Sequence, residues 1–479
     1  MMRIKVLIIF SIILFWNLNG YTTMYEVSKG GSYTNLTDVP TVDGDTIHII
    51  DNARYNEFYG VLDNNLTIMG DPDNRPEIYN DYYILNIEAS NVTLKNLRIT
   101  LGYPPVNDYM VLIVSNNIKI SNCEFTALDN SHKHIGIRIE KGRNIVIENC
   151  VFRDFKSTAI FISNMTGNIK IKDSLFFNLD NGIVLKKVDS DADVEKLEII
   201  NNIFHNISSN AIYETNINPI TNILLYNLIY NCADYGIKMY GNSYSYIYNN
   251  TIAKGGGGLF LKVENSYEWY LYNNIFYYND IYYDFYFDNN GMSPIFELRN
   301  NCINSRAIAG GMTVDENNIN IDPLFVNMDN YDFHLRGDSP CVDSGLYIDY
   351  QNEFGFSPPI YNGVIDRGAL EFFPVEESVK NNNANVRVEL AANNLINGMP
   401  LLIRVSNLDK ISSSDKVHLE ASVYSITGKK VKDLFNANVN TSASLDIKWN
   451  NNKKVKSGLY LLYVKINDKS YIKKFFIMR

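Results

Sequence analysis

The chain has 479 residues, enough for two domains with sizeable cores, and a formal net charge of −10. The charge is uneven, because residues from Val388 onwards carry 15 Lys+Arg and 7 Asp+Glu, which leaves −18 for residues 1–387. Such an acidic surface repels polyanions, which argues against DNA or RNA as a partner and against strongly anionic glycans unless Ca²⁺ bridges the two. Five cysteines are an odd number, which excludes a complete disulfide framework.

Residues 1–20 have the pattern of a secretory signal peptide. Arg3 and Lys5 precede an apolar run from Val6 to Trp16, and cleavage is expected near Gly20. The run is too short to span a bilayer comfortably, and no second apolar segment follows it. We therefore expect an exported protein, secreted or held at the cell surface, with no transmembrane segment after signal removal.

A pattern of short apolar alternation recurs along most of the chain. In Asn144–Phe152, Ile145 and Ile147 show the alternation of a strand, and Asn149 ends it. Similar patterns end at ten anchor residues: Gly70, Asn96, Asn122, Asn149, Asp173, Asn201, Asn227, Asn249, Asn273 and Asn300. The steps between anchors are 26, 26, 27, 24, 28, 26, 22, 24 and 27 residues, and a drifting period in the twenties built from short strands indicates a solenoid.

A second strand, opened by a small residue, runs in step with the first, as in Gly136–Ile139, Gly182–Leu185 and Gly236–Met239. A short third strand follows each anchor. Three strands per turn close a triangular coil, and about ten coils at ~4.8 Å each give a rod of roughly 50 Å. The helix-forming half of a leucine-rich repeat is missing, so the pattern predicts an all-β rod.

These residues resemble exported bacterial right-handed parallel β-helix proteins, the pectate-lyase-like superfamily. The resemblance implies three parallel sheets, called first, second and third, with the anchor asparagine at the turn from the second to the third. Met24–Ser32 is similar to the opening of that family, and Asp338–Gly345 to its closing segment. We therefore expect a right-handed parallel β-helix over residues 21–374, closed by 320–373. The fold hosts many activities, so the resemblance alone implies no function.

Two of the cysteines are predicted to be neighbours in space. Cys123 and Cys150 each follow an anchor in adjacent coils, so we expect them to stack one above the other. The simpler interpretation is a pair of buried thiols in a column of small apolar residues. A disulfide is the alternative, although it is geometrically awkward between in-register parallel neighbours.

Residues 375–387 have the composition of a linker, and antiparallel strand patterns such as His418–Tyr424 and Gly458–Val464 follow. About ninety residues of this kind predict a small β-sandwich at 388–479. Val423–Val431 and Lys473–Phe476 resemble two families, the C-terminal sorting domains of type IX secretion cargo and the Ig-like domains of flagellar hook-capping proteins. Either implies a non-catalytic module that contacts the cell envelope or the secretion machinery.

In the lyase-like members of the superfamily, the active groove runs along the first sheet. Uronate β-elimination needs a base and a cation that neutralises the substrate carboxylate. On outward positions of this sheet, Lys186, Lys238 and Lys262 are the candidate bases and Arg138 is the candidate neutralising cation. The alternative is a solvated face of mixed charge.

Asp189, Asp191 and Asp193 have the spacing that begins a Ca²⁺-binding loop. The glycine at the sixth position and the glutamate at the twelfth are missing. Ca²⁺ is therefore kept as the one candidate ion, with an ordinary acidic loop as the alternative, and no other cofactor is expected.

Outward positions of the second sheet are mostly polar in early coils and become tyrosines in three adjacent later coils: Tyr226, Tyr246, Tyr248, Tyr270 and Tyr272. A flat aromatic tract suits stacking on sugar rings, with phenol hydroxyls for hydrogen bonds. The alternative is a docking face for the closing segment or the C-terminal domain, because exposed apolar patches of this size usually meet a partner.

The sequence therefore favours an exported, surface-associated β-helix protein that binds polysaccharide. One alternative is a polysaccharide lyase that acts on the first sheet. The other is a structural or adhesive surface protein with no glycan ligand and no catalytic activity.

Overall fold

The computed structural model describes residues 22–478. The residues left out of that range are 57–59, 62, 72–74, 81–84, 103–108, 129–133, 187–194, 216–219, 242, 266, 305–307, 310–316, 359–363, 373–386, 391–393, 397–400, 407, 409–415, 426–429, 441–444, 450–457 and 468. The predicted signal peptide at 1–20 and all but the last residue of the predicted linker at 375–387 lie outside the described residues.

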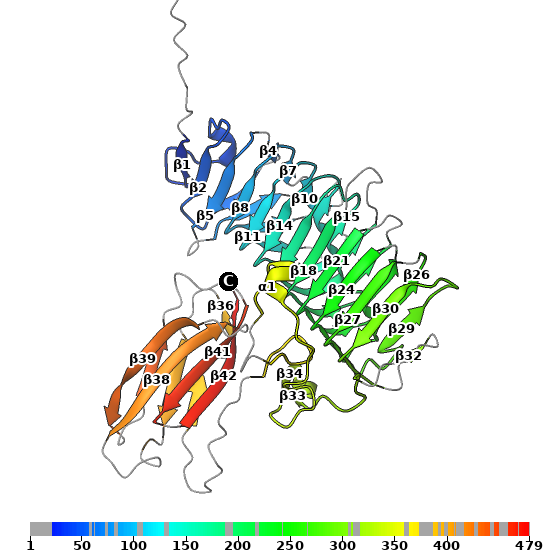
Figure 1. Cartoon of the computed structure of the whole chain (residues 1–479). Coiled ribbons are helices and arrows are strands. Elements are labelled where there is room, and N and C mark those ends of the chain that lie inside the picture. Colours follow the sequence, from blue (N-terminus) through cyan, green and yellow to red (C-terminus); the bar gives the residue numbers. More distant parts are fainter. Residues whose placement is uncertain are drawn as a thin grey trace, which may run out of the picture.

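Residues 24–309 form a rod of parallel strands, arranged in three sheets and about ten coils (Figure 1). The second sheet consists of β1 (Met24–Val27), β2 (Thr46–Ile49), β5 (Thr67–Gly70), β8 (Thr93–Lys95), β11 (Lys119–Ser121), β14 (Ile145–Glu148), β16 (Ile169–Lys172), β18 (Lys196–Ile200), β21 (Ile220–Leu225), β24 (Ser243–Tyr248), β27 (Glu268–Tyr272) and β30 (Ile295–Arg299). The predicted all-β right-handed parallel β-helix is confirmed.

The first and third sheets are joined, because β15 (Val151–Ile162) and β17 (Leu175–Leu185) run through both. The first sheet also contains β4 (Gly60–Val61), β7 (Leu85–Ile87), β10 (Tyr109–Ile113), β13 (Ile135–Ile139), β20 (Ile212–Glu214), β23 (Tyr235–Gly241), β26 (Gly257–Val263), β29 (Phe285–Asp288) and β32 (Ile308–Ala309). The third sheet adds β3 (Arg54–Tyr55), β6 (Glu77–Asn80), β9 (Arg98–Leu101), β12 (Glu124–Ala127), β19 (Ile203–Ile207), β22 (Leu228–Cys232), β25 (Thr251–Ala253), β28 (Ile275–Tyr277) and β31 (Cys302–Ile303). A 3-10 turn, η1 (Leu36–Asp38), lies between β1 and β2.

Inward-facing side chains of the three sheets form one continuous core along the rod. Ile145 and Ile147 are fully buried, as the alternation predicts. On the third sheet the rings of Phe125, Phe152, Phe176 and Phe204 stack in successive coils with centroids 4.6, 4.9 and 4.5 Å apart. In-register pairing therefore turns a sequence repeat into columns of like side chains.

Eight of the ten anchor residues lie at the turn after the second sheet in the left-handed conformation, with φ of 54° at Asn201 and 52° at Asn249, whereas Gly70 is the last residue of β5. Asparagine tolerates this conformation better than most residues. The prediction of Asn227 as the anchor of its coil is wrong. Tyr226 takes the turn position with φ 55°, and Leu224 faces the core while Ile223 and Leu225 face outward.

Asn227 belongs instead to a second asparagine column, one position further along and inside the rod. Its members are Asn202, Asn227, Asn250, Asn274 and Asn301, all of them buried. The Asn227 Oδ1 accepts hydrogen bonds from the backbone N and Nδ2 of Asn202 at 3.0 and 3.1 Å, and Asn250 serves Asn227 in the same way. This ladder of asparagine side chains supplies hydrogen-bond partners to the buried backbone N–H groups at the turns of successive coils.

The closing segment packs on the outside of the later coils. It contains β33 (Phe325–Asn327), η3 (Met328–Asn330), β34 (Asp332–Leu335) and α1 (Tyr350–Phe354). Phe333 and Leu370 cover the third sheet, and Ile348, Tyr350 and Ile365 cover the second. Asp366, whose pKa burial raises to about 6, accepts the backbone N–H groups of Asp343 and Phe372, so it is a structural carboxylate.

Residues 387–478 form a two-sheet sandwich with its own core. One sheet has the order β35 (Arg387–Leu390), β37 (Leu401–Ser406), β40 (Leu445–Trp449); the other has β36 (Asn394–Ile396), β42 (Lys469–Met478), β41 (Gly458–Ile466), β38 (Lys416–Ser425), β39 (Lys430–Asn440). Both sheets contribute to the core, with Val405 from one and Leu419 and Leu462 from the other fully buried. The predicted small C-terminal β-sandwich is confirmed.

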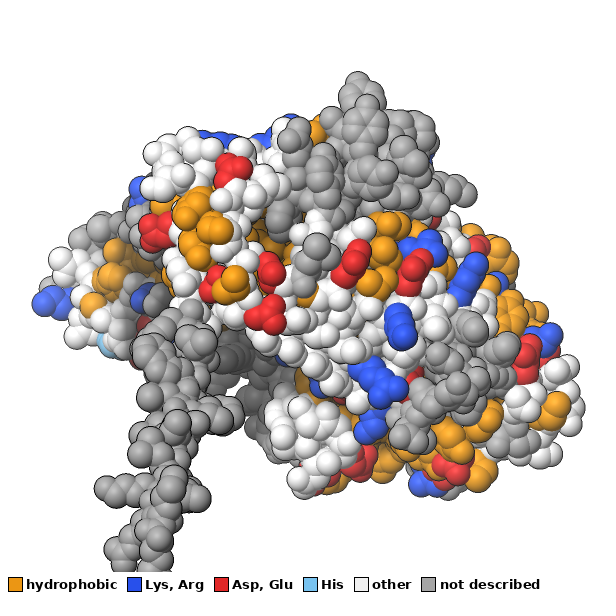
Figure 2. Space-filling model, turned by 90° about the horizontal axis from the view of Figure 1, so that it is seen from above, with side chains coloured by type: hydrophobic (Ala, Val, Ile, Leu, Met, Phe, Trp, Pro, Cys, Tyr) orange, Lys and Arg blue, Asp and Glu red, His pale blue; other side chains and the backbone are white. Residues whose placement is uncertain are grey.

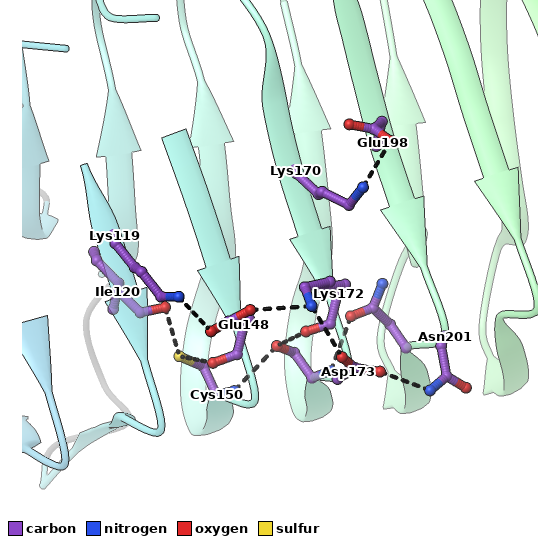
Figure 3. Close-up of polar contacts among 11 residues, drawn as sticks. Lys119, Ile120, Glu148, Cys150, Lys170, Lys172, Asp173, Glu198 and Asn201 are labelled. Carbon is purple, nitrogen blue, oxygen red and sulfur yellow. Dashed lines mark hydrogen bonds and ion pairs between the residues drawn. The ribbon is translucent and has the colours of Figure 1, made fainter. Parts of the chain in front are cut away.

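All five cysteines are buried free thiols. Cys123 and Cys150 lie in adjacent coils inside the rod, with the Cys150 Sγ directed at the backbone oxygens of Ile120 and Glu148 (Figure 3). The interpretation as buried thiols is therefore confirmed over the disulfide alternative.

The inward and outward positions of β14 make a direct test of the register. Glu148 lies on the outer face between Lys119 and Lys172, at 3.0 and 3.1 Å (Figure 3). Burial raises the pKa of Glu148, but the hydrogen bonds from these two lysines outweigh it and hold the pKa below its usual value. Ion pairs on such a surface contribute little, because solvent screens them.

Replacing Ile147 by Asp should therefore cost at least about 4 kcal/mol of unfolding free energy, since it buries an unpaired carboxylate and leaves a cavity. Glu148→Ala should cost less than about 1 kcal/mol. Urea unfolding of the purified chain measures both. Equal losses in the two variants would contradict the register.

Candidate functional site

Outward positions of the first sheet form a column that runs along the rod. Strand pairing aligns Arg138, Phe161, Val184, Tyr213, Lys238, Phe260 and Tyr286 in successive coils. The column contains Arg138 and Lys238, while Lys186 and Lys262 lie two positions after Val184 and Phe260. The first half of the column is mixed in character, and the second half is aromatic.

Two of the candidate catalytic residues flank one ring, and Lys238 lies apart from them. Arg138 is paired with Glu140 at 2.8 Å, and the Arg138 Cζ and the Lys186 Nζ lie 5.8 and 5.6 Å from the centroid of the Phe161 ring. Lys238 is four coils from Arg138, which is roughly 19 Å at about 4.8 Å per coil. A base at Lys238 and a neutralising cation at Arg138 therefore lie too far apart to act on one sugar residue.

Lys238 lies among aromatic rings. Its Nζ is 5.9, 5.8, 5.7 and 5.4 Å from the ring centroids of Tyr213, Tyr235, Tyr240 and Phe260. None of the ion pairs formed within the described part of the chain involves Lys238. The ammonium is thus held by ring faces, which attract a cation through their quadrupole.

Further rings extend this group across the surface. Tyr286 stacks on Phe260 with centroids 4.7 Å apart, and Tyr282 stacks on Tyr235 at 5.1 Å. Tyr283 lies 5.7 Å from Tyr286, and Tyr282 and Tyr283 remain 47% and 41% exposed. We name the whole set the Lys238 platform: Tyr213, Tyr235, Lys238, Tyr240, Phe260, Tyr282, Tyr283 and Tyr286.

Glycines let the backbone approach the platform closely. A Cβ on Gly257 would lie 2.4 Å from the Tyr235 ring, and one on Gly258 would lie 2.1 Å from the backbone oxygen of Asp284. Asp284 accepts hydrogen bonds from the Asn279 N and Nδ2 at 3.0 and 2.5 Å, and burial raises its pKa to about 6. These contacts fix the turn that carries Tyr282 and Tyr283.

Sequence reasoning found the platform only in part. Strand alternation places Tyr213, Lys238, Tyr240, Phe260 and Tyr286 on outward positions of the first sheet. Tyr235 is instead the first residue of β23, and Tyr282 and Tyr283 lie just before β29. The tetraglycine at Gly255–Gly258 and the tyrosine pair at 282–283 were the available signals.

The predicted tyrosine tract on the second sheet is largely covered. Tyr246 stacks on Tyr270 at 5.5 Å and Tyr248 on Tyr272 at 4.8 Å, as the register predicts. Tyr226 and Tyr248, however, are only 3% exposed. The prediction that they form an open glycan-binding surface is wrong, and the alternative of a docking face for the closing segment describes them.

Aromatic side chains of the closing segment provide the cover. Tyr350 and Phe356 contact Tyr226, and Phe354 contacts both Tyr246 and Tyr248. Tyr246, Tyr270 and Tyr272 stay partly exposed. The hydroxyls of Tyr270 and Tyr272 donate to Glu268 and Glu297 at 2.9 and 2.5 Å, so two of these three phenols are already engaged.

The proposed Ca²⁺ ligands Asp189, Asp191 and Asp193 lie outside the described residues. Within the residues that are described, no group of three or more His, Cys, Asp or Glu side chains is placed to hold a metal ion. Charge of both signs and hydrophobic side chains are interspersed on the face of the molecule shown in Figure 2.

Comparison with known proteins assigns both parts of the chain. A family model described as the right handed beta helix region matches residues 38–196 and 180–326. The chain belongs to this β-helix family. A secretion system C-terminal sorting domain matches residues 404–478. A search of curated proteins found no match.

The sorting domain decides between the two resemblances of the C-terminal sandwich. It marks proteins that are secreted by the type IX system and attached to the cell surface. This β-helix protein is therefore secreted and surface-located, and its C-terminal domain interacts with the secretion machinery. Among the described residues, no helix is long and apolar enough to cross a membrane.

Because Tyr248 is buried, replacing it should lower the free energy of unfolding. Tyr248→Ser should cost about 3 kcal/mol, because it empties a site beneath Phe354 and Tyr350. Tyr270→Ser, at the same sheet but partly exposed, should cost about 1 kcal/mol or less. Urea unfolding measures both, and a Tyr248→Ser variant as stable as wild type would show that the closing segment does not pack there.

The two modules have separate cores, which predicts that they can be divided. Ending the chain at Pro374 should leave the rod folded, with the melting temperature of its transition unchanged, and should abolish delivery to the cell surface. Circular dichroism and cell fractionation measure these outcomes. A truncated rod that fails to fold would contradict the division.

Proposed function

We propose that this secreted β-helix protein binds carbohydrate at the cell surface through the Lys238 platform. The observation that carries the proposal is the cluster of rings on adjacent coils around one ammonium that no carboxylate of the described residues pairs with. The protein reaches the surface by an N-terminal signal peptide and the sorting domain. The covered tyrosines of the second sheet serve the fold instead.

Geometry of the platform suits an extended glycan. Its rings on the first sheet belong to successive coils about 4.8 Å apart, which is comparable to the length of one sugar residue in an extended chain. Aromatic faces offer flat apolar area to the C–H face of a sugar, while phenol hydroxyls offer hydrogen bonds. The ammonium of Lys238 adds a charged donor for a sugar oxygen.

Partial exposure of the platform, in which Tyr282 and Tyr283 are exposed and Tyr235 is buried, argues against a purely structural role. Its ring contacts are all within the rod, whereas Tyr226 and Tyr248 are covered by the closing segment. Exposed clusters of apolar rings usually mark an interaction site. The distance between Arg138 and Lys238 excludes only a lyase in which Lys238 is the base beside Arg138.

Replacing Tyr240, Tyr282 and Tyr286 together by Ser tests the proposal. The loss of three rings should weaken glycan binding by about 2–3 kcal/mol, or roughly 30- to 150-fold, while the melting temperature stays within a few degrees of wild type. Retention on insoluble glycans and affinity electrophoresis against a panel of neutral and acidic polysaccharides provide the measurement.

Tyr246→Ser/Tyr270→Ser is the matched control, because it removes two stacked, partly exposed rings from the other sheet. It should retain wild-type binding. Unsaturated sugar products would instead support the lyase, and a wild-type chain that binds no glycan in the panel would leave the structural or adhesive alternative.

A further inference from the structure

One acidic side chain faces the inside of the rod. Glu214, at the end of β20, is aligned with Leu185 of β17 and Met239 of β23, which are both core residues. Its side chain is 2% exposed. A carboxyl group therefore stands at a position where the neighbouring coils place aliphatic side chains.

Glu214 is paired with an amide from the opposite wall. Asn222 of β21 is fully buried, between Leu197 of β18 and Ser245 of β24 in the inward column of the second sheet. Its Nδ2 donates to the Glu214 Oε2 at 2.7 Å. The other oxygen of each group, Glu214 Oε1 and Asn222 Oδ1, has no hydrogen-bond partner among the described residues.

Among the described residues, no Lys or Arg side chain pairs with this carboxyl. The charged side chains on the strands packed against it face outward: Asp180 on β17, Lys196 and Glu198 on β18, and Lys238 on β23. Lys186, just after β17, is exposed, and β21 and β24 carry no Asp, Glu, Lys or Arg. Glu195, at the start of the adjacent coil, is a second buried acid.

We propose that Glu214 is a buried proton-binding site, held as a neutral carboxylic acid against Asn222, and that its ionisation loosens this part of the rod. With a proton on Oε1, the acid donates to Asn222 Oδ1, and both oxygens that lack a partner gain one. Acid and amide then make two parallel hydrogen bonds. A carboxylate in the same place would keep one hydrogen bond and a desolvated charge.

The direction of the pH effect follows from burial. Burial raises the pKa of Glu214 to about 8 from a usual value of 4.5, against the smaller lowering effect of the Asn222 hydrogen bond. Below pH 4.5 the group is protonated in the folded and unfolded chain alike, and its full contribution to stability is present. As pH rises towards 8 the unfolded chain loses the proton first, so stability falls across this window.

Infrared spectroscopy of the full chain at pH 7 tests the protonation state directly. Asp284 and Asp366, whose pKa values burial raises to about 6, are then mostly ionised, so Glu214 should dominate the carbonyl stretch of a protonated carboxyl. The band should disappear in Glu214→Gln and as the wild type passes pH 8. A wild-type spectrum at pH 7 without this band would overturn the proposal.

Thermal unfolding between pH 5 and pH 8 tests the consequence. The melting temperature of wild type should fall by several degrees more than that of Glu214→Gln, whose amide can donate to Asn222 Oδ1 at any pH. Glu148→Gln, at a half-buried glutamate on the outer face of the second sheet, should keep the wild-type pH dependence. Parallel curves for wild type and Glu214→Gln would overturn the proposal, and the infrared test decides if that variant does not fold.

Discussion

In-register parallel pairing of the coils is the constraint on which the rest of this molecule depends. Each side chain lies about 4.8 Å from the residue at the same position in the coils above and below, so its main neighbours are distant in sequence. Like residues then stabilise one another, as the stacked rings from Phe125 to Phe204 and the buried asparagine ladder show. A residue that differs from its column needs another partner, as Glu214 finds in Asn222 and Tyr226 in the closing segment.

Periodicity was sufficient to predict the fold, because it records which side of each strand is buried. It failed by one residue at Tyr226 for a physical reason. In the neighbouring coils the turn residue and the ladder residue are both asparagine, as in Asn201–Asn202 and Asn249–Asn250. Where tyrosine takes the turn position, a single asparagine remains, and the sequence alone does not distinguish the ladder role from the turn role.

Candidate sites were harder to predict than the fold. The alternation of apolar and polar residues shows which side chains face the core, but it does not show which outward side chains another segment covers. Tyr226 and Tyr248 have the pattern of exposed residues and are buried by a segment about a hundred residues away. The cover depends on tertiary contacts such as the Tyr350 hydroxyl, which donates to Asn249 Oδ1 at 2.5 Å. The same limit applied to Tyr235 and Tyr282, because the first residue of β23 stacks on a residue of the turn before β29 and strand alternation does not predict that contact.

The path of the closing segment determines which outer faces of the later coils it covers. It covers apolar residues on the outside of the second and third sheets in the later coils, including Leu225 and Leu228. The aromatic rings of the first sheet in those coils make their contacts within the rod. The tyrosines of the later coils therefore fall into two groups. Those of the second sheet pack against the closing segment, and those of the first sheet lie on the outer face of a protein located at the cell surface.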